Sequence, residues 1–295
     1  MNTADTGGGA AAGVDAAKLE THLKRLVGIR HHETAPENLE AAADYILDRF
    51  SSFGLRTREQ GFPAFGRQNR NIIGQIGPSD PGRPVLILGA HYDTVSRSPG
   101  ADDNASGLAV LLEAARILAS GSPVFPLLFI AFAQEESGCL GSRFFVQDFM
   151  AGGGALKGMA ALECVGFASN EPGTQQRVPN IPISMPDRGD FIGIVGNPPA
   201  SARIQGMEAA IKGMEEALPY LTLEVPGAGE RLPDSRRSDH APFWDAGLPA
   251  LMLTDTANYR NPNYHQPGDR LETLNRVFIK QVAEAVVRFL RNAGE

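Results

Sequence analysis

Short apolar runs alternate along the chain with longer segments of helical periodicity. The runs at 85–89, 127–133 and 159–164 are too short for helices and are rich in aliphatic side chains. Such runs are typical of strands that are buried on both faces of a sheet. Weaker strand patterns follow the same rhythm, at 55–60, 71–76, 191–196, 221–225 and 250–254.

Apolar residues recur every three or four positions between these strands, which indicates amphipathic helices. The predicted helices span 15–27, 36–53, 105–119, 200–218, 239–246 and 274–293, and another begins near Gly141. Thr34 followed by Glu37 predicts a capping box at the start of the second helix. Because strands alternate with helices, we expect an α/β fold. It would be a single three-layer domain with a mixed, mostly parallel sheet and helices on both faces.

Two segments do not follow this rhythm. Residues 169–190 include prolines at 172, 179, 182 and 186, which predict a long irregular loop of the kind that forms rims or lids. Residues 1–14 are mostly Gly, Ala and Thr, with no basic start and no long apolar core. We expect a disordered leader there rather than a signal peptide, and a catalytic domain over 15–295.

Composition and charge narrow the possible partners of the chain. Its net charge of -7 argues against nucleic acid or an anionic membrane as the main partner. No apolar run approaches the roughly 18 residues that a membrane helix needs. Cys139 and Cys164 are the two cysteines of the sequence, which is too few for a disulfide framework and fits a reducing compartment. We therefore expect a cytoplasmic protein, and whether the two cysteines pair stays open.

Residues that bind metals follow the ends of separate predicted strands. They are His91, Asp103, Glu136, Glu163 and His265. Five nitrogen and oxygen ligands are too many for one tetrahedral zinc that keeps an open position. They suit two metals about 3.5–4 Å apart that share a bridging carboxylate. Asp103 is the expected bridge, because it lies in a loop between the other ligand-bearing segments.

Two further acids stand beside these candidate ligands. Asp93, two residues after His91, can accept a hydrogen bond from the ring nitrogen of that histidine that faces away from the metal. Glu135 is adjacent to Glu136, and one of two such carboxylates can bind metal while the other takes a proton from the attacking water. Cys164 is expected to point away from Glu163, because side chains alternate along a strand.

Six motifs carry a family resemblance. They are G-A-H-Y-D-T at 89–94, G-A-D-D-N-A-S-G at 100–107, Q-E-E-S-G at 134–138, L-E at 162–163, S-D-H-A-P-F at 238–243 and N-Y-H-Q-P-G-D at 263–269. With this content and order, the chain resembles the two-zinc aminopeptidases of metallopeptidase family twenty-eight, a group of zinc-dependent exopeptidases. The resemblance runs from about residue 30 to the C-terminal helix.

The resemblance implies a role for each matching residue. One zinc would be held by His91 and Glu163, the other by Glu136 and His265, and Asp103 would bridge them. Glu135 would be the general base and acid, with Asp93 behind His91. Tyr264 matches a tyrosine that steadies the oxyanion in some relatives. Glu163 departs from the pattern, because many aminopeptidases of the family carry aspartate there.

We therefore expect a metal-dependent aminopeptidase that acts on peptides or small amides. Phe167, Phe191, Phe243 or Trp244 would line its side-chain pocket. Three alternatives stay open: a single-zinc acyltransferase like the glutaminyl cyclases, a carboxypeptidase or other amidohydrolase on the same fold, and a binding module without activity. The D-D-N-A-S-G loop argues against the first, and the complete set of ligands with Glu135 argues against the last. Asp102 is expected to cap its loop, and Asp239 with His240 to begin a helix beside the ligands.

Overall fold

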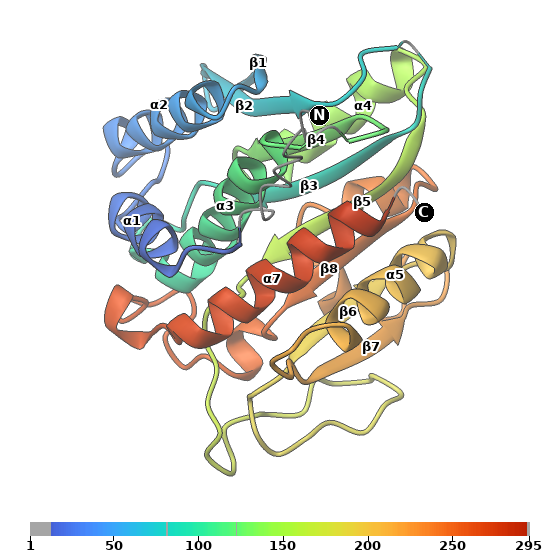
Figure 1. Cartoon of the computed structure of the whole chain (residues 1–295). Coiled ribbons are helices and arrows are strands. Elements are labelled where there is room, and N and C mark those ends of the chain that lie inside the picture. The colour runs from blue at the N-terminus through green and yellow to red at the C-terminus, as the bar shows by residue number, and fades with distance from the viewer. Residues whose placement is uncertain (1–12, 81, 122, 294–295) are drawn as a thin grey trace, which may run out of the picture.

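The computed structural model describes residues 13–80, 82–121 and 123–293. Its centre is an eight-stranded sheet in the order β1-β2-β4-β3-β5-β8-β6-β7 (Figure 1). The strands are β1 (Arg56–Ala64), β2 (Arg67–Ile76), β3 (Val85–His91), β4 (Leu127–Phe132), β5 (Leu156–Glu163), β6 (Ile192–Gly196), β7 (Tyr220–Glu224) and β8 (Ala250–Thr254). The helices are α1 (Ala16–Leu26), α2 (Pro36–Ser52), α3 (Gly107–Ala119), α4 (Leu140–Ala151), α5 (Ser201–Lys212), α6 (Ala241–Asp245) and α7 (Arg276–Asn292).

The sheet is mixed and mostly parallel. Strands β4, β3, β5 and β8 run parallel to one another in the middle, whereas β2 pairs antiparallel with β4 and β6 pairs antiparallel with β8. This arrangement confirms the predicted fold class. The carboxyl ends of the four central strands meet at one edge of the sheet, which is where parallel α/β folds place their sites.

Helices cover both faces of the sheet, so the hydrophobic core has two parts. On one face α1, α2, α3, α5 and α7 pack together, and α3 and α7 lie side by side over the central strands (Figure 1). On the other face α4 and α6 bury Phe145, Phe243 and Trp244 against the sheet. The central strands are apolar on both sides because each side meets a helix layer.

The first two strands are longer than the pattern predicted. They form a hairpin whose turn at Phe65 and Gly66 has positive φ at both residues, as a two-residue turn between twisted strands requires. The hairpin lies at the edge of the sheet and many of its side chains are exposed, so its apolar signal is weak. In contrast, α5 ends at Lys212, six residues before the predicted end at 218. Gly213 is the residue that follows the helix.

The predicted capping box at the start of α2 is wrong. The residue before the helix is Ala35, which has no capping side chain, and Pro36 supplies the first helical position. The hydroxyl of Thr34 instead donates to the backbone carbonyl of Ser96 at 3.3 Å. Thr34 therefore ties the entry of α2 to the loop that follows β3.

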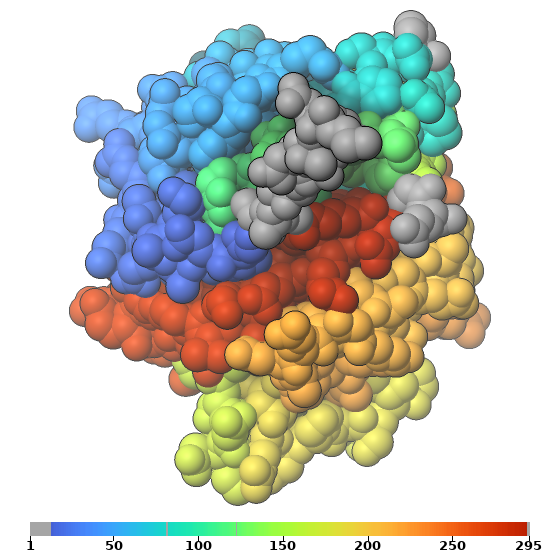
Figure 2. All heavy atoms as spheres, viewed as in Figure 1, coloured from blue at the N-terminus to red at the C-terminus, as the bar shows by residue number. Residues whose placement is uncertain are grey.

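The segment at 169–190 has the irregular structure that its prolines predicted. An isolated bridge between Ser169 and Gly189 closes it at its base, and it forms the yellow-green surface at the lower end of Figure 2. In the described ranges, no helix is long and apolar enough to cross a membrane. Most of the predicted leader, residues 1–12, lies outside the described residues, and Val14 packs against the core.

Candidate active site

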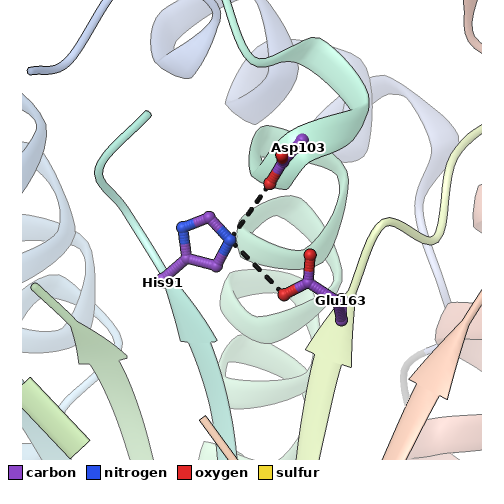
Figure 3. A group of neighbouring side chains, drawn as sticks. All are labelled: His91, Asp103 and Glu163. Carbon is purple, nitrogen blue, oxygen red and sulfur yellow. Dashed lines mark ion pairs between the residues drawn. The ribbon is translucent and has the colours of Figure 1, made fainter. Parts of the chain in front are cut away.

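The predicted ligands gather at the carboxyl edge of the central strands. His91 ends β3, Glu163 ends β5, and Glu136 lies in the loop after β4. Asp103 lies in the turn Ala101–Ser106 that leads into α3, and His265 lies in the loop after β8. Figure 3 shows His91, Asp103 and Glu163 pointing toward one another from these separate elements. The sheet order thus unites residues that are far apart in sequence.

Two groups of three ligands share Asp103. In the first, His91 Nε2 lies 3.1 Å from Asp103 Oδ1 and 3.4 Å from Glu163 Oε2. In the second, His265 Nε2 lies 3.0 Å from Asp103 Oδ2 and 3.1 Å from Glu136 Oε2. Each carboxylate oxygen of Asp103 therefore faces a different histidine. This geometry would allow one carboxylate to serve both groups.

Unpartnered polar atoms in this cluster fit bound metal. His91 Nδ1 donates to the backbone carbonyl of Asp93 at 3.2 Å, which directs Nε2 toward the acids. The atoms His91 Nε2, His265 Nε2, Asp103 Oδ1 and Glu136 Oε1 are buried without a well-formed hydrogen bond. Imidazole nitrogens and carboxylate oxygens are a typical ligand set for zinc. The site has the residues that the family resemblance assigns to two zinc ions.

The electrostatics of the cluster also favour cations. Burial lowers the pKa of His265, but the adjacent carboxylates of Asp103 and Glu136 outweigh burial and raise that pKa to about 10. Burial raises the pKa of Glu136 to about 7. Burial and the neighbouring carboxylates, which outweigh the opposing charge of His91, raise the pKa of Glu135 well above its usual range. The clustered carboxylates stabilise bound protons on the neighbouring side chains. A bound metal cation would supply the same positive charge and replace those protons.

Glu135 and Glu163 have distinct surroundings. Glu135 Oε2 lies 4.0 Å from His91 Nε2, so this acid is beside the first ligand group without belonging to either group. Glu163 Oε2 accepts a hydrogen bond from the hydroxyl of Ser238 at 2.8 Å. The longer side chain of Glu163 therefore still reaches its histidine, and Ser238 fixes its orientation.

Both cysteines are free and buried, and each thiol touches an acid of the site. Cys139 Sγ lies 3.6 Å from Glu135 Oε1, and Cys164 Sγ lies 3.3 Å from Glu163 Oε1. The expectation that Cys164 points away from Glu163 is wrong. Cys164 has a φ of 49°, so the chain leaves the extended conformation there and strand alternation ends.

Asp93 holds the loop that carries the two adjacent acids. Its Oδ1 accepts from the backbone N–H of Glu135 at 3.0 Å, and its Oδ2 accepts from that of Glu136 at 3.1 Å. The His91 ring nitrogen lies 3.6 Å from Asp93 Oδ1 and bonds to the Asp93 backbone carbonyl instead. Asp93 therefore contacts His91 through its backbone carbonyl, and its side chain holds the backbone of Glu135 and Glu136.

Several buried residues support the ligands although the sequence assigned them no such role. Asp269 accepts hydrogen bonds from the backbone N–H groups of Asp102 and Asp103 at 2.9 and 3.2 Å. The amide of Asn104 links this turn to the end of β5, where its Nδ2 donates to Leu162 at 2.7 Å. Asp269 belongs to the motif at 263–269 and Asn104 to the motif at 100–107. Their presence in these motifs was the sequence signal that could have identified them as supporting residues.

Asp102 and His240, near the site, have structural contacts. Asp102 is fully buried and accepts from the Gly166 N–H at 2.9 Å and from Asn261 Nδ2 at 2.8 Å, so it joins three segments rather than capping one loop. His240 precedes α6 as predicted, and its Nε2 bonds to the Ser235 carbonyl at 2.7 Å. None of these residues belongs to a ligand group in the described part of the chain.

An apolar pocket opens beside the ligands. Glu163 and Tyr264 lie in its wall, and the segment at 169–190 covers it with four side chains. These are Val178, Ile181, Ile183 and Met185. Of the four aromatic residues that the sequence suggested, Phe191 lines the pocket, whereas Phe243 and Trp244 are buried in the core. Phe167 is outside the lining, and its N–H donates to Asp255 at 2.8 Å.

Sequence comparison supplies independent evidence on the family. The sequence model of Peptidase family M28 matches residues 71–180 and 191–290, which include every ligand described above. The Escherichia coli protein YfbL, described as uncharacterized, is 36% identical over 94% of this chain and 88% of its own length. Aminopeptidase YwaD of Bacillus subtilis is 27% identical over 76% of this chain, and the match covers 44% of that protein.

Solved structures share the fold. LapA aminopeptidase from Legionella pneumophila superposes with a TM-score of 0.76 at 20% identity, over 96% of this chain and 72% of LapA. The glutaminyl cyclase of Porphyromonas gingivalis superposes with a TM-score of 0.70 at 21% identity, over 94% and 98%. The fold alone therefore does not separate these two chemistries. The family match and the ligand geometry together show that the chain belongs to Peptidase family M28 and is a metallopeptidase of that family.

Proposed function

We propose that this metallopeptidase is an aminopeptidase with a dinuclear zinc site. The observation that carries the proposal is the position of Asp103, whose two carboxylate oxygens face His91 and His265 at 3.1 and 3.0 Å. A carboxylate shared in this way suits two metals about 3.5–4 Å apart. When bound, the two zinc ions would polarise the scissile carbonyl and lower the pKa of the attacking water.

The side chains around the metals would carry out proton transfer and charge stabilisation. Glu135 lies beside His91 and is free of both ligand groups, so it would take the proton of the attacking water and return it to the leaving amine. The Tyr264 ring stacks on the His265 ring with 3.9 Å between centroids, and its hydroxyl would donate to the developing oxyanion. A general base placed in this way contributes roughly 10²–10⁴-fold to the rate.

The site would also select the amino end of a substrate. A free amine would sit against the metals and Glu135, the acid of this cluster that belongs to neither ligand group. An N-acetyl group would leave buried polar atoms unpaired, at a cost on the order of 1–3 kcal/mol each. We therefore expect the free amine to be required.

The pocket would receive the side chain of the residue that is released. Its wall of Ile181, Ile183, Met185 and Phe191 is apolar, so it favours leucyl, methionyl or phenylalanyl residues over small or charged ones. The relatives named aminopeptidases are consistent with this reaction, but they share only part of the sequence.

The proposal is tested with a leucyl peptide and its N-acetylated twin, incubated with the zinc-loaded protein. Products identified by mass should show single residues released from the free-amine peptide and little cleavage of the acetylated one. Equal cleavage of the twin, or release from the carboxyl end, would move the protein to the amidohydrolase or carboxypeptidase alternatives.

A glutaminyl-cyclase-like acyltransferase is the second candidate, because a cyclase shares the fold at a TM-score of 0.70. Incubation with a peptide that begins with glutamine separates the two functions. Cyclisation would lower the peptide mass by the mass of ammonia without breaking the chain, whereas an aminopeptidase would release free glutamine. The pair of ligand groups around Asp103 favours the peptidase.

A further inference from the structure

The hydroxyl of Tyr264 is bound by an arginine that lies outside both ligand groups. Arg237 Nη2 donates to the Tyr264 hydroxyl oxygen at 3.1 Å, and the guanidinium carbon lies 5.5 Å from the centre of the tyrosine ring. Arg237 stands one residue before Ser238, which holds Glu163. The same short segment therefore contacts a metal ligand and the candidate oxyanion donor.

The chemistry of the guanidinium fixes the direction of this hydrogen bond. Arginine carries five N–H donors and no acceptor, so the Tyr264 oxygen must accept from Arg237. The hydroxyl proton of Tyr264 cannot point at Arg237 and stays available for another acceptor. No other hydrogen bond of this hydroxyl occurs in the described part of the chain.

The surroundings of Tyr264 direct that proton toward the substrate. Its ring stacks on the ring of His265 at an interplanar angle of 15°, and Tyr264 and Glu163 both line the apolar pocket beside the metals. Arg237 lines the same pocket and occupies a lone pair of the hydroxyl oxygen, so the hydroxyl proton is left for another acceptor in the pocket. The oxygen that becomes negative during attack on the scissile bond would be the acceptor in that direction.

Arg237 is itself held in place by one other segment and by the turn that precedes it. Its Nη1 donates to Asn258 Oδ1 at 2.7 Å and lies 3.5 Å from Asp234 Oδ1. Asn258 belongs to the turn after β8, and Asp234 to the turn before Ser238. The guanidinium thus has a fixed orientation before any substrate arrives, which is what a preorganised site requires.

We propose that Arg237 is a positioning residue that fixes the hydrogen-bond polarity of Tyr264, so that the tyrosine donates its proton to the oxyanion of the substrate. The inference rests on the proposed aminopeptidase function. Arg237 acts through Tyr264 and does not touch the scissile bond. Its effect is on the rate of the chemical step, and it leaves binding of the ground-state substrate almost unchanged.

A double-mutant cycle on the zinc-loaded protein tests the coupling. Tyr264→Phe should lower kcat about 10²-fold, in the range found when one oxyanion donor is lost. Arg237→Met should lower kcat about tenfold with KM within about twofold, and the double variant should be no slower than Tyr264→Phe alone. In Arg237→Lys the side chain can still donate a hydrogen bond but cannot accept one, so this variant should keep part of the kcat that Arg237→Met loses. Independent, multiplicative losses would overturn the proposal.

The matched control is the neighbouring arginine. Arg236 pairs with Asp245 at 2.6 Å and has no contact with Tyr264 among the described residues. Arg236→Met removes the same kind of side chain from the same segment and should leave kcat unchanged. A loss as large as that of Arg237→Met would assign the effect to the fold of the segment and overturn the proposal.

Two further measurements do not depend on turnover. An aminoalkyl boronic acid, which presents a tetrahedral oxyanion, should bind Arg237→Met about tenfold more weakly by calorimetry, whereas free leucine should bind as before. In metal-free protein with ¹³Cζ-labelled tyrosine, Arg237→Met should shift the resonance that Tyr264→Phe removes, and an unmoved resonance would contradict the proposal. This spectrum also separates the inference from the proposed function, because it applies even if the wild-type protein releases no amino-terminal residue.

Discussion

The side chain of Asp93 accepts a hydrogen bond from the backbone N–H of Glu135, with 3.0 Å between Oδ1 and the nitrogen. Asp93 follows the strand that ends in the first histidine ligand, and Glu135 follows the neighbouring strand β4. One carboxylate therefore couples the ligand-bearing end of β3 to the loop that carries the candidate general base. This hydrogen bond between the motif at 89–94 and the motif at 134–138 fixes the position of one relative to the other.

Replacement of Asp93 tests this link. In Asp93→Asn, one backbone N–H of the 135–136 loop faces an amide NH₂ group and loses its acceptor. We expect turnover or zinc affinity to fall by about 10–100-fold, as for residues that orient metal ligands. The measurement is kcat at saturating zinc, beside zinc affinity by competition with a chelating dye. Wild-type values for both quantities would show that the hydrogen bonds do not support the site.

The two adjacent acids should fail in different ways. Glu135→Gln should keep both the fold and the bound metal but lower kcat by at least about 10²-fold, because the base is lost. Glu136→Gln should instead weaken the metal group that it shares with His265 and Asp103. Elemental analysis and kinetics on the same preparations separate the two results. Release of metal by Glu135→Gln alone would reverse these assignments.

The number of metals bound per chain should depend on Asp103, because both ligand groups contain it. The wild-type protein, loaded with excess zinc and desalted, should retain more than one metal per chain. His91→Ala should lose the metal of the group with Glu163 and keep the other, whereas Asp103→Asn should weaken both groups because both contain Asp103. Elemental analysis with circular dichroism of each variant measures metal and fold together. A stoichiometry of one in the wild type would favour the cyclase-like function.

The pocket should control which residue is released. Ile183 lies in the pocket wall and is only partly buried, so a larger side chain can be placed there without disturbing the core. Ile183→Trp should lower kcat/KM for leucyl and phenylalanyl substrates about tenfold or more relative to an alanyl substrate. Ile183→Leu, which conserves volume, is the control and should change little. An equal fall for all three substrates would place the released side chain elsewhere.

Acid should destabilise the protein partly through His22. Burial and the nearby charge of Arg49 lower its pKa from 6.5 to about 4, and its Nδ1 bonds to the Tyr45 hydroxyl. The lowered pKa means that the unfolded state binds the proton first. The stability that this residue contributes is therefore fully present above about pH 6.5 and is lost as the pH falls toward 4.

Protonation of His22 should lower the free energy of unfolding by about 2 kcal/mol between pH 7 and pH 5. His22→Gln has no titrating ring, and its amide can still bond to Tyr45. The fall in the free energy of unfolding between these two pH values, measured with urea, should be smaller in the variant by about that amount. An identical fall in the two proteins would contradict the lowered pKa.

The sequence alone determined the fold class and named the candidate ligands, because both depend on local patterns. Short apolar runs such as 127–133 are typical of strands buried between two helix layers, and their alternation with helices predicts a mostly parallel sheet. A parallel sheet brings its carboxyl ends to one edge, so ligand-type residues at those ends, such as His91 and Glu163, were expected to meet. Prolines likewise marked the loop at 169–190.

Only the tertiary structure decided how the ligands are supported. Asp93 contacts Glu135 across 42 residues, and Ser238 contacts Glu163 across 75, because the strand order places segments side by side that are remote in sequence. The reversal of Cys164 toward Glu163 also depends on one left-handed backbone conformation. Such contacts have no periodic signal in the chain, because they arise from the packing of whole elements and not from the preferences of neighbouring residues.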